Sequence, residues 1–169
     1  MKAIVVVDSR WGIGAKNDLL FHLKADMRHF KELTDGKTVL MGYNTLLSFP
    51  EGKPLKNRKN IVLAPEGVER EDCIVVHTLE ALSQLVASPS NEELFVIGGA
   101  MFYHTMLPYC ETVYVTKVAA DGGAAVFFDN LDAMPQWRLA EESSPIEDNG
   151  QTIRFCTYVN SSPLPFVLA

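Results

Sequence analysis

One carboxylate lies within a largely apolar stretch, LLFHLKADMRHF at residues 19–30. With about 100° per residue, Leu23, Met27 and Phe30 fall on one stripe of a helix, and Asp26 lies at the edge of that stripe. An ionised carboxylate against apolar side chains costs several kcal/mol unless a partner compensates. Two explanations are open. Asp26 is an acid of the first helical turn, stabilised by the helix N-terminus and by water, or it lies at the bottom of an apolar pocket and accepts two parallel donors from a flat aminopyrimidine or amidine ligand.

Two glycine-containing turns are candidates for phosphate binding. FVIGGAMFYHTML passes from an apolar run into a helix through Gly98 and Gly99, and TVLMGYNTLLSF does so through Gly42, followed by Asn44 and Thr45. Glycine lets a phosphate approach the backbone, and the amides at a helix start face it. An ordinary strand-to-helix turn uses the same residues. Two such turns in one small domain favour a dinucleotide with bridging phosphates.

A third stretch, SRWGIGAKNDLL at residues 9–20, has two glycines and few residues typical of a core. The dinucleotide fingerprint G-x-G-x-x-G is not met, because Asn17 occupies the third glycine position. We interpret the stretch as a mobile loop over the site, while an ordinary connection explains it equally well.

The elements that must position these residues alternate along the chain. Continuous apolar runs predict strands covered on both faces, at residues 3–7, 38–41, 60–64, 73–77, 94–98 and 112–118. Helical patterns lie between them, at residues 24–34, 43–48, 78–87 and 99–107. The run 151–160 alternates Ile153, Phe155, Thr157 and Val159 on one side and predicts a closing antiparallel strand. We therefore expect a single α/β domain, with a central, mostly parallel sheet of about eight strands and helices on both faces.

Length, net charge and cysteine count narrow the class of protein. A chain of 169 residues suits one domain, here residues 1–160, with 161–169 as a C-terminal extension. A formal net charge of −6 argues against nucleic acid as the main partner. Three widely spaced cysteines favour neither a disulfide framework nor a metal site, and they fit a reducing cytoplasm. We expect no signal peptide and no membrane span, since no apolar run is long enough.

Several segments together resemble a known family. GIGAKNDLLFHLKADMRHFKELT, TVLMGYNT, PLKNRKNIVL, FVIGGAMFYHTMLP and VYVTKV, in this order and at these spacings, are similar to dihydrofolate reductase of the chromosomal bacterial type, from residue 2 to about 160. The resemblance implies that Asp26 binds the pyrimidine edge of dihydrofolate in the pterin pocket. It also implies that Thr116 holds this carboxylate and the substrate amino group, partly through water.

The resemblance implies binding residues as well. Arg58 would bind the α-carboxylate of the substrate glutamate, a task suited to a planar guanidinium. Without the resemblance, four apolar side chains of this set are expected in the core: Met27, Phe30, Phe49 and Leu55. The full implied substrate set is Ile4, Val5, Phe21, Met27, Phe30, Phe49, Leu55, Arg58, Ile97 and Tyr103. The implied cofactor set is Val6, Ile13, Gly14, Asn17, Leu19, Gly42, Tyr43, Asn44, Thr45, Leu63, Ala64, Gly98, Gly99, Ala100, Met101 and Phe102, with a cis peptide joining the paired glycines.

The sequence departs from the family around the substrate and the mobile loop. Leu20 and Phe21 replace the usual proline and tryptophan, and Lys24 replaces a frequent proline. The family's D-T-x-F-P stretch is GGAAVFFD at residues 122–129, so the acid that steadies the mobile loop has no counterpart at the same place.

The cofactor side departs as well. Tyr43 replaces the arginine that contacts the 2′-phosphate of NADPH, Ala64 and Pro65 replace hydroxyl residues, and Met101 replaces a second arginine. Preference for NADPH over NADH should weaken, because charged hydrogen bonds contribute about 1.5 to 3 kcal/mol each.

The implied activity is hydride transfer from a reduced nicotinamide, NADPH with NADH not excluded, to dihydrofolate. From the resemblance we also expect a cytoplasmic, monomeric protein that binds no metal. Two alternatives stay open: a non-catalytic relative that binds a nucleotide or pterin, and a reductase of another pterin or a flavin precursor. Retention of both Asp26 and Arg58 counts against the latter, because a substrate without the glutamate tail has no use for Arg58.

Overall fold

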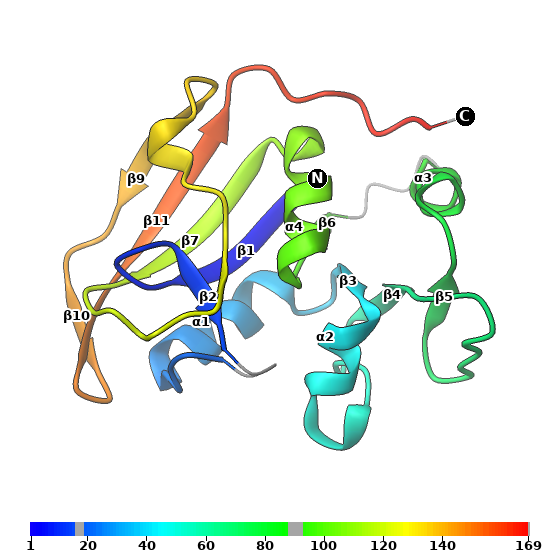
Figure 1. Ribbon diagram of the computed structural model, residues 1–169, viewed down its shortest axis with the longest axis horizontal. Coiled ribbons are helices and arrows are strands. Elements are labelled where there is room, and N and C mark those ends of the chain that lie inside the picture. Colours follow the sequence, from blue (N-terminus) through cyan, green and yellow to red (C-terminus); the bar gives the residue numbers. More distant parts are fainter. Residues whose placement is uncertain (16–18, 88–92, 169) are drawn as a thin grey trace.

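A nine-stranded sheet forms the centre of the computed structural model, which describes residues 1–15, 19–87 and 93–168 (Figure 1). Eight strands follow the order β10-β11-β7-β1-β6-β3-β4-β5, and β9 pairs with β11 as well. Their bounds are β1 Lys2–Val7, β3 Thr38–Gly42, β4 Lys59–Leu63, β5 Ile74–Val76, β6 Leu94–Val96, β7 Thr112–Val118, β9 Trp137–Glu142, β10 Ile146–Asp148 and β11 Gln151–Asn160. Within this order, each neighbouring pair from β7 through β1, β6, β3 and β4 to β5 is parallel, and β11 is antiparallel to β7. The expected α/β architecture with an antiparallel C-terminal strand is confirmed.

The four predicted helices are present. They are α1 Lys24–Thr34, α2 Tyr43–Ser48, α3 Leu79–Val86 and α4 Ala100–Met106. Thr78 caps α3, because its side chain accepts a hydrogen bond from the Ala81 amide at 3.0 Å. By contrast, the N-cap position of α1 is Leu23, which provides no side-chain cap. Short 3-10 segments follow at Pro50–Gly52, Leu107–Tyr109 and Leu131–Ala133.

The two faces of the sheet bury different helices, as the alternation along β1 shows. Val5 belongs to a core cluster with Phe102 and Met106 of α4 and Leu82 of α3. Its neighbour Ile4 belongs to a second cluster, into which α2 contributes Leu46 and α1 contributes Phe30 and Leu33. A third, smaller cluster on Leu23, Val118 and Ile153 holds the start of α1 against β7 and β11. Helices on both faces are therefore confirmed.

The burial of β11 differs from the expected one-sided alternation. Ile153 is buried on one face, but Cys156 and Tyr158 are buried on the other, whereas Phe155 is only partly buried. The pairing of β11 with β9 shifts register between Thr157 and Tyr158. Both faces of this strand carry apolar cover, so alternation of residue types alone does not identify the buried side.

Four strands of the described part of the chain were not predicted. Besides β9 and β10, a small separate sheet pairs β2 Gly12–Gly14 with β8 Val126–Phe127. These strands are two or three residues long apart from β9, which exposes five of its six residues. Such segments lack the continuous apolar run on which the sequence prediction depends.

The chain beyond β11 lies along the surface from η2 at Leu107–Tyr109 to α3 (Figure 1). The Leu164 amide donates to the Pro108 carbonyl at 2.9 Å, and the Ser83 hydroxyl donates to the Leu168 carbonyl at 3.2 Å. The ring of Phe166 lies 4.9 Å from that of Tyr109. Within the described residues, no helix is long and apolar enough to cross a membrane.

Candidate active site

The carboxyl of Asp26 has a direct partner. Asp26 lies in the first turn of α1, and the Thr116 hydroxyl of β7 donates a hydrogen bond of 2.6 Å to its Oδ1 atom. Burial raises the pKa of Asp26, the bond from Thr116 lowers it, and the negative charge of Asp148 raises it, with a net rise. The carboxyl is therefore half-buried, bonded on one oxygen and easier to protonate than a free aspartate.

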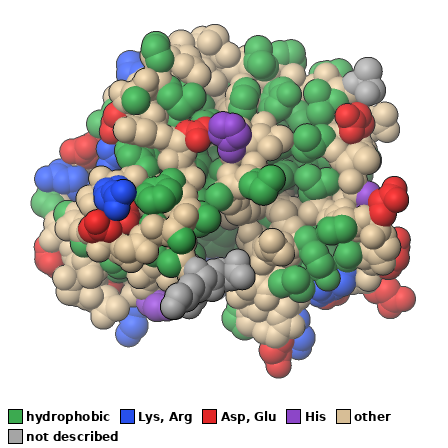
Figure 2. All heavy atoms as spheres, viewed as in Figure 1, with side chains coloured by type: hydrophobic (Ala, Val, Ile, Leu, Met, Phe, Trp, Pro, Cys, Tyr) green, Lys and Arg blue, Asp and Glu red, His purple; other side chains and the backbone are tan. Residues whose placement is uncertain are grey.

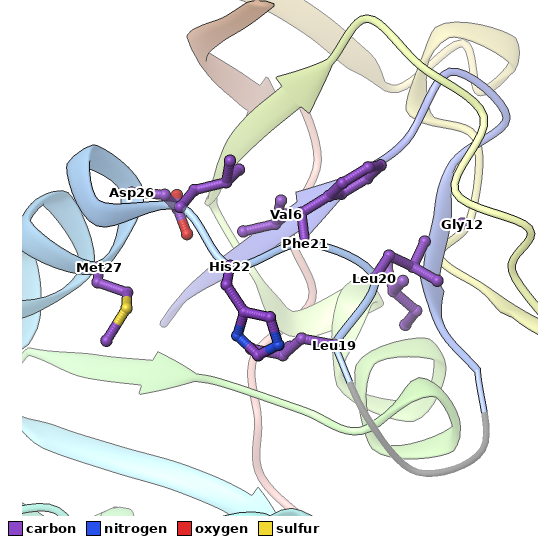
Figure 3. A pocket seen from close by; sticks show the side chains of 10 residues that line it. Val6, Gly12, Leu19, Leu20, Phe21, His22, Asp26 and Met27 are labelled. Atoms are coloured by element: carbon purple, nitrogen blue, oxygen red, sulfur yellow. The ribbon is translucent and has the colours of Figure 1, made fainter. Parts of the chain in front are cut away.

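Apolar side chains surround this carboxyl on several sides. The pocket at Asp26 is lined by Val6, Gly12, Ile13, Leu19, Leu20, Phe21, His22, Leu23 and Met27. In Figure 3 the carboxyl extends from α1 toward Val6 of β1, and residues 19–22 pass along the other side of the pocket. Figure 2, viewed as in Figure 1, shows hydrophobic side chains gathered in a hollow near the middle of the molecule's visible face. The second explanation for Asp26, a carboxylate in an apolar pocket, is the one that this geometry supports.

Leu20 and Phe21 of the pocket lie close to Gly122, whose loop is bonded to a second carboxylate, that of Asp8. Asp8 is buried, and its two oxygens accept hydrogen bonds from the amides of Arg10, Gly12 and Gly122 at 2.8, 2.7 and 3.0 Å. A Cβ atom at Gly122 would lie 2.9 Å from Leu20 Cδ1 and 3.0 Å from Phe21 Cζ. The resemblance did not identify Asp8. The family's loop acid was sought in the stretch 122–129, whereas Asp8 lies directly after β1 and bonds that stretch at the Gly122 amide.

The expected substrate residues on the second core cluster lie together. Phe30, Phe49, Leu55 and Ile97 are partly buried and pack against the cluster that contains Ile4. They come from α1, the end of α2, the following loop and the end of β6. Partial burial leaves part of each side chain exposed and available to a ligand.

Met27 and Val5 differ from expectation in opposite ways. Met27 is 65% exposed, so its assignment to the core from helical spacing is wrong, and its side chain lines the open pocket at Asp26. Val5 is buried on the other face of the sheet, among residues of α3 and α4. The side chain of Val5 therefore points away from the pocket, because adjacent residues of a strand face opposite sides.

Two polar side chains of the expected substrate set lie next to residues of the second core cluster. The guanidinium of Arg58 lies 5.9 Å from the ring centroid of Phe30, and its Nε donates to the Lys56 carbonyl at 2.9 Å. Tyr103 is buried, and its hydroxyl donates to the Ile4 carbonyl at 2.6 Å. Burial raises the pKa of Tyr103 far above its ordinary value, and the charge of Asp26 adds to this rise, so the phenol stays neutral.

The two glycine turns meet at the carboxyl ends of β3 and β6. The Gly42 amide donates to the Gly98 carbonyl at 2.9 Å, and the peptide between Gly98 and Gly99 is cis, as the resemblance implied. A Cβ atom on Gly98 would lie 3.3 Å from the Thr45 hydroxyl. Ligands of open α/β sheets bind at this end of the strands.

The other expected cofactor residues surround these turns and the pocket. Leu19 and Met101 are 63% and 86% exposed, and Asn44 is also exposed. Val6, Ile13, Tyr43, Leu63 and Ala100 are partly buried, whereas Gly14, Ala64 and Phe102 are buried. Asn17 lies outside the described residues. Ala64 bonds its amide to the Val76 carbonyl at 2.9 Å, and Phe102 packs into the core beneath α4.

A cation lies close enough to Tyr43 for the two side chains to interact. The pKa of Arg70 is raised, chiefly by its bond to Asp72, and Tyr43 contributes to the rise. The guanidinium of Arg70 donates to both Asp72 oxygens, at 2.9 and 2.7 Å, and to the Gly52 carbonyl at 2.8 Å. Its charge is therefore already paired with a carboxylate.

The pocket also contains residues outside the implied substrate and cofactor sets. Gly12, Leu20, His22 and Leu23 line it beside the expected residues. Leu20, His22 and Leu23 flank the predicted Phe21, so a search of the residues before α1 could have found them. Asp148 gives no local signal, because 123 positions separate it from its partner Ala25.

Comparison with known proteins agrees with this geometry. Residues 1–160 match the model of the dihydrofolate reductase family. A dihydrofolate reductase of Bacillus subtilis is 36% identical over 159 residues, which are 92% of this chain and 91% of that protein. One of Staphylococcus haemolyticus is 31% identical, covering 86% and 85% of the two chains. A solved dihydrofolate reductase of Enterococcus faecalis, complexed with NADP(H) and RAB-propyl, superposes with a TM-score of 0.82 at 27% identity, covering 95% and 96%. This chain belongs to the dihydrofolate reductase family.

Proposed function

We propose that the protein reduces 7,8-dihydrofolate to 5,6,7,8-tetrahydrofolate, with a reduced nicotinamide as the hydride donor. The observation that carries the proposal is the Asp26 carboxyl, bonded to Thr116 at 2.6 Å and lined by apolar side chains. A pterin presents two adjacent N–H donors on a flat ring, which a carboxylate binds as a pair. The family membership and the relatives named above support the same reaction.

The proposed substrate orientation follows from two sets of polar side chains. Asp26 and Thr116 bind the pyrimidine edge, and Arg58 binds the α-carboxylate of the glutamate tail. Phe30 and Leu55 contact the rings between these ends, where they are partly buried. A guanidinium suits the carboxylate because its N–H groups match the two oxygens.

The residues at the glycine turns fit a dinucleotide. Side chains on Gly98 or Gly99 would approach the Thr45 hydroxyl to 3.3 and 3.5 Å, so glycine leaves the backbone accessible there. Asn44 and Thr45 offer amide and hydroxyl donors at the start of α2, after the N-cap residue Gly42, and Ala100 begins α4. Such donors suit bridging phosphates. The Enterococcus faecalis relative was solved with NADP(H), which supports a nicotinamide cofactor for this chain.

The protein's own contribution is positioning and control of one proton. When bound, the nicotinamide supplies the hydride that C6 of dihydrofolate accepts. Asp26 holds the pyrimidine edge and, with its raised pKa, favours a proton in the pocket where N5 must receive one. Leu20 and Phe21 exclude water beside it, and β1 supplies Val6 as the apolar floor.

We propose that NADPH is used with a weak preference over NADH. Tyr43, Ala64 and Met101 are the residues at positions where the family usually has two arginines and a hydroxyl. Arg70 near Tyr43 is bonded to Asp72, which opposes its recruitment to a phosphate. Losing one charged hydrogen bond would reduce the preference by about 1.5 to 3 kcal/mol.

The decisive assay follows oxidation of NADPH, and separately of NADH, in the presence of dihydrofolate. We expect turnover with at least one cofactor, and a large loss near neutral pH in Asp26→Asn. Glu32→Gln is the matched control, because Glu32 is an exposed acid on the same helix. Cofactor binding without turnover would identify a non-catalytic relative instead. Turnover of a pterin or flavin precursor but not of dihydrofolate would identify another reductase.

Assembly and location stay predictions. We propose a monomer for two reasons. The resemblance implies a family whose members are mostly monomeric, and the sequence has no additional apolar stripe on a helix that could bind a second copy. Light scattering of the purified chain tests the assembly, and a mass twice that of 18.8 kDa would contradict it. The proposed cytoplasmic location rests on the cysteine pattern and on the resemblance, and it is tested by fractionation.

A further inference from the structure

We propose that Asp148, on the β10–β11 hairpin, is a positioning residue for Asp26: its carboxylate caps the first turn of α1 and brings a second negative charge to the residue next to Asp26. The part of this proposal that concerns catalysis rests on the proposed function. The contact itself is independent of that function.

The cap comes from a distant part of the chain. The Ala25 amide, in the first turn of α1, donates a hydrogen bond of 2.7 Å to Asp148 Oδ2. The N-cap residue Leu23 has no side-chain acceptor, so Asp148 supplies the acceptor that the local sequence lacks. A carboxylate at this end of a helix is also favoured by the helix dipole.

The hairpin holds the same segment at a second point. The Asn149 side-chain amide donates to the His22 carbonyl at 3.0 Å, and His22 lines the pocket at Asp26. Asn149 and Gly150 have positive φ values of 49° and 78°, as in the tight Asn-Gly turns that join antiparallel strands. The turn fixes Asp148 opposite Gln151, so this carboxylate has a defined place beside α1.

One sheet therefore places both partners of this helix start. In β11, which carries the hairpin, Phe155 pairs with Thr116 of β7. Thr116 bonds the Asp26 carboxyl and Asp148 bonds the preceding backbone amide. The side chain and the backbone of the catalytic turn are thus both anchored to this sheet, which fixes the direction of the carboxyl.

The charge of Asp148 has a consequence that a neutral cap would lack. The start of a helix favours the ionised form of an acid in its first turn, and a nearby carboxylate opposes this effect. Asp148 contributes to the raised pKa of Asp26, after burial, while Thr116 of β7 acts in the other direction. Tyr103 of α4 is close enough for the charge of Asp26 to raise its pKa, and its phenol is neutral. His22 lines the same pocket, and Lys24 and Arg28 of α1 are exposed.

The test removes the charge and keeps the shape. In Asp148→Asn the amide oxygen still accepts from Ala25, so the fold should persist while the Asp26 pKa falls. Glu147→Gln is the matched control: Glu147 is the preceding residue of the same strand, is exposed, and bonds the Thr152 hydroxyl at 2.6 Å. A carbon-13 NMR titration of the Asp26 carboxyl in the unliganded chain measures its pKa directly.

We expect the Asp26 titration to move to lower pH in Asp148→Asn and to stay unchanged in Glu147→Gln. The pH profile of dihydrofolate reduction should move in the same direction, because a smaller fraction of Asp26 is protonated at a given pH. Asp148→Ala should in addition lower the melting temperature by roughly 2 to 4 °C, as expected for a lost cap. Asp148→Ser should restore much of that loss, since its hydroxyl accepts from the helix amide, while leaving the pKa of Asp26 low.

Two results would overturn the proposal: an Asp26 titration that is identical in Asp148→Asn and wild type, or an equal shift in Glu147→Gln. The NMR measurement needs no substrate. A shifted titration in a chain that does not reduce dihydrofolate would therefore refute the proposed function and leave this inference standing.

Discussion

The Thr116 hydroxyl and the Asp26 carboxyl, 90 positions apart in the chain, are joined by a hydrogen bond of 2.6 Å. The bond crosses from β7 to the first turn of α1 and gives the half-buried acid a partner. It also lowers the pKa of Asp26, against the larger effect of burial, which raises it.

Thr116→Val should therefore move the pKa of Asp26 further upward. Loss of a hydrogen bond to a charged group costs about 1.5 to 3 kcal/mol, so kcat/KM for dihydrofolate should fall by roughly 10- to 150-fold near neutral pH. The measurement is the pH profile of kcat/KM. Thr112→Val is the control, since Thr112 begins the same strand and is partly buried. An unchanged profile in Thr116→Val would show that the bond has no role in substrate binding.

Asp26→Asn should stabilise the fold near neutral pH while it removes activity. The folded pKa of Asp26 is raised above the ordinary value of 3.8, so folding favours the protonated form. The corresponding stability is complete below pH 3.8 and is lost as the pH rises through the folded pKa. Asparagine carries no charge and avoids this loss.

Urea denaturation at pH 7 and near pH 3.5 checks the Asp26 prediction. The variant should have the larger free energy of unfolding at pH 7, and the difference should shrink at the lower pH. Each pKa unit corresponds to about 1.4 kcal/mol. A variant less stable than wild type at pH 7 would contradict the burial of an unfavourable charge.

Arg58→Leu should weaken binding of the glutamate-bearing substrate. Its guanidinium lies 5.9 Å from the ring centroid of Phe30. We expect KM for dihydrofolate to rise roughly 10- to 150-fold, from the same range of charged hydrogen-bond energies, with a smaller change in kcat. A dihydropterin without the glutamate tail should bind equally to both proteins. Lys53→Leu, which removes an exposed cation, is the control.

Tyr43→Arg should increase the preference for NADPH over NADH. The new guanidinium would supply one charged hydrogen bond to a 2′-phosphate, which corresponds to roughly 10- to 150-fold in the ratio of kcat/KM values. Gln84→Arg adds the same charge on the exposed side of α3 and should leave that ratio unchanged. If wild type already prefers NADPH by several thousandfold, another residue must bind the phosphate.

Asp8→Asn should destabilise the protein most at neutral pH. Burial of Asp8 acts to raise its pKa, but bonds from the amides of Gly122, Gly12 and Arg10, with the charge of Arg10, outweigh it and lower the pKa. Stability from this carboxylate is present above pH 3.8 and is lost as the pH falls through the folded pKa.

Thermal denaturation tests the Asp8 prediction. The asparagine side chain of the variant has a single acceptor oxygen and cannot accept all three bonds. We therefore expect a melting temperature lower by roughly 3 to 10 °C at pH 7 and a smaller deficit at pH 4. Asp121→Asn is the control, because Asp121 is an exposed acid of the facing loop. Because Gly122 contacts Leu20 and Phe21, KM for dihydrofolate should rise in Asp8→Asn but not in the control.

Periodicity and spacing determined much of this protein without any coordinates. The apolar runs predicted the parallel strands, and helical spacing predicted α1 with Asp26 at its first turn. These features are local, because a strand or a helix repeats its pattern within a few residues. The resemblance then supplied Thr116 and Arg58, whose types and neighbours in the chain give no chemical signal by themselves.

The tertiary structure decided which distant groups meet. Thr116 reaches Asp26, Asp148 reaches Ala25, and Asp8 reaches Gly122 across 90, 123 and 114 positions. It also decided that Val5 faces away from the pocket and that Met27 lies open to it. Hydrogen bonds and burial depend on how strands are ordered in the sheet and how helices cover it, and no local pattern of residue types encodes that order.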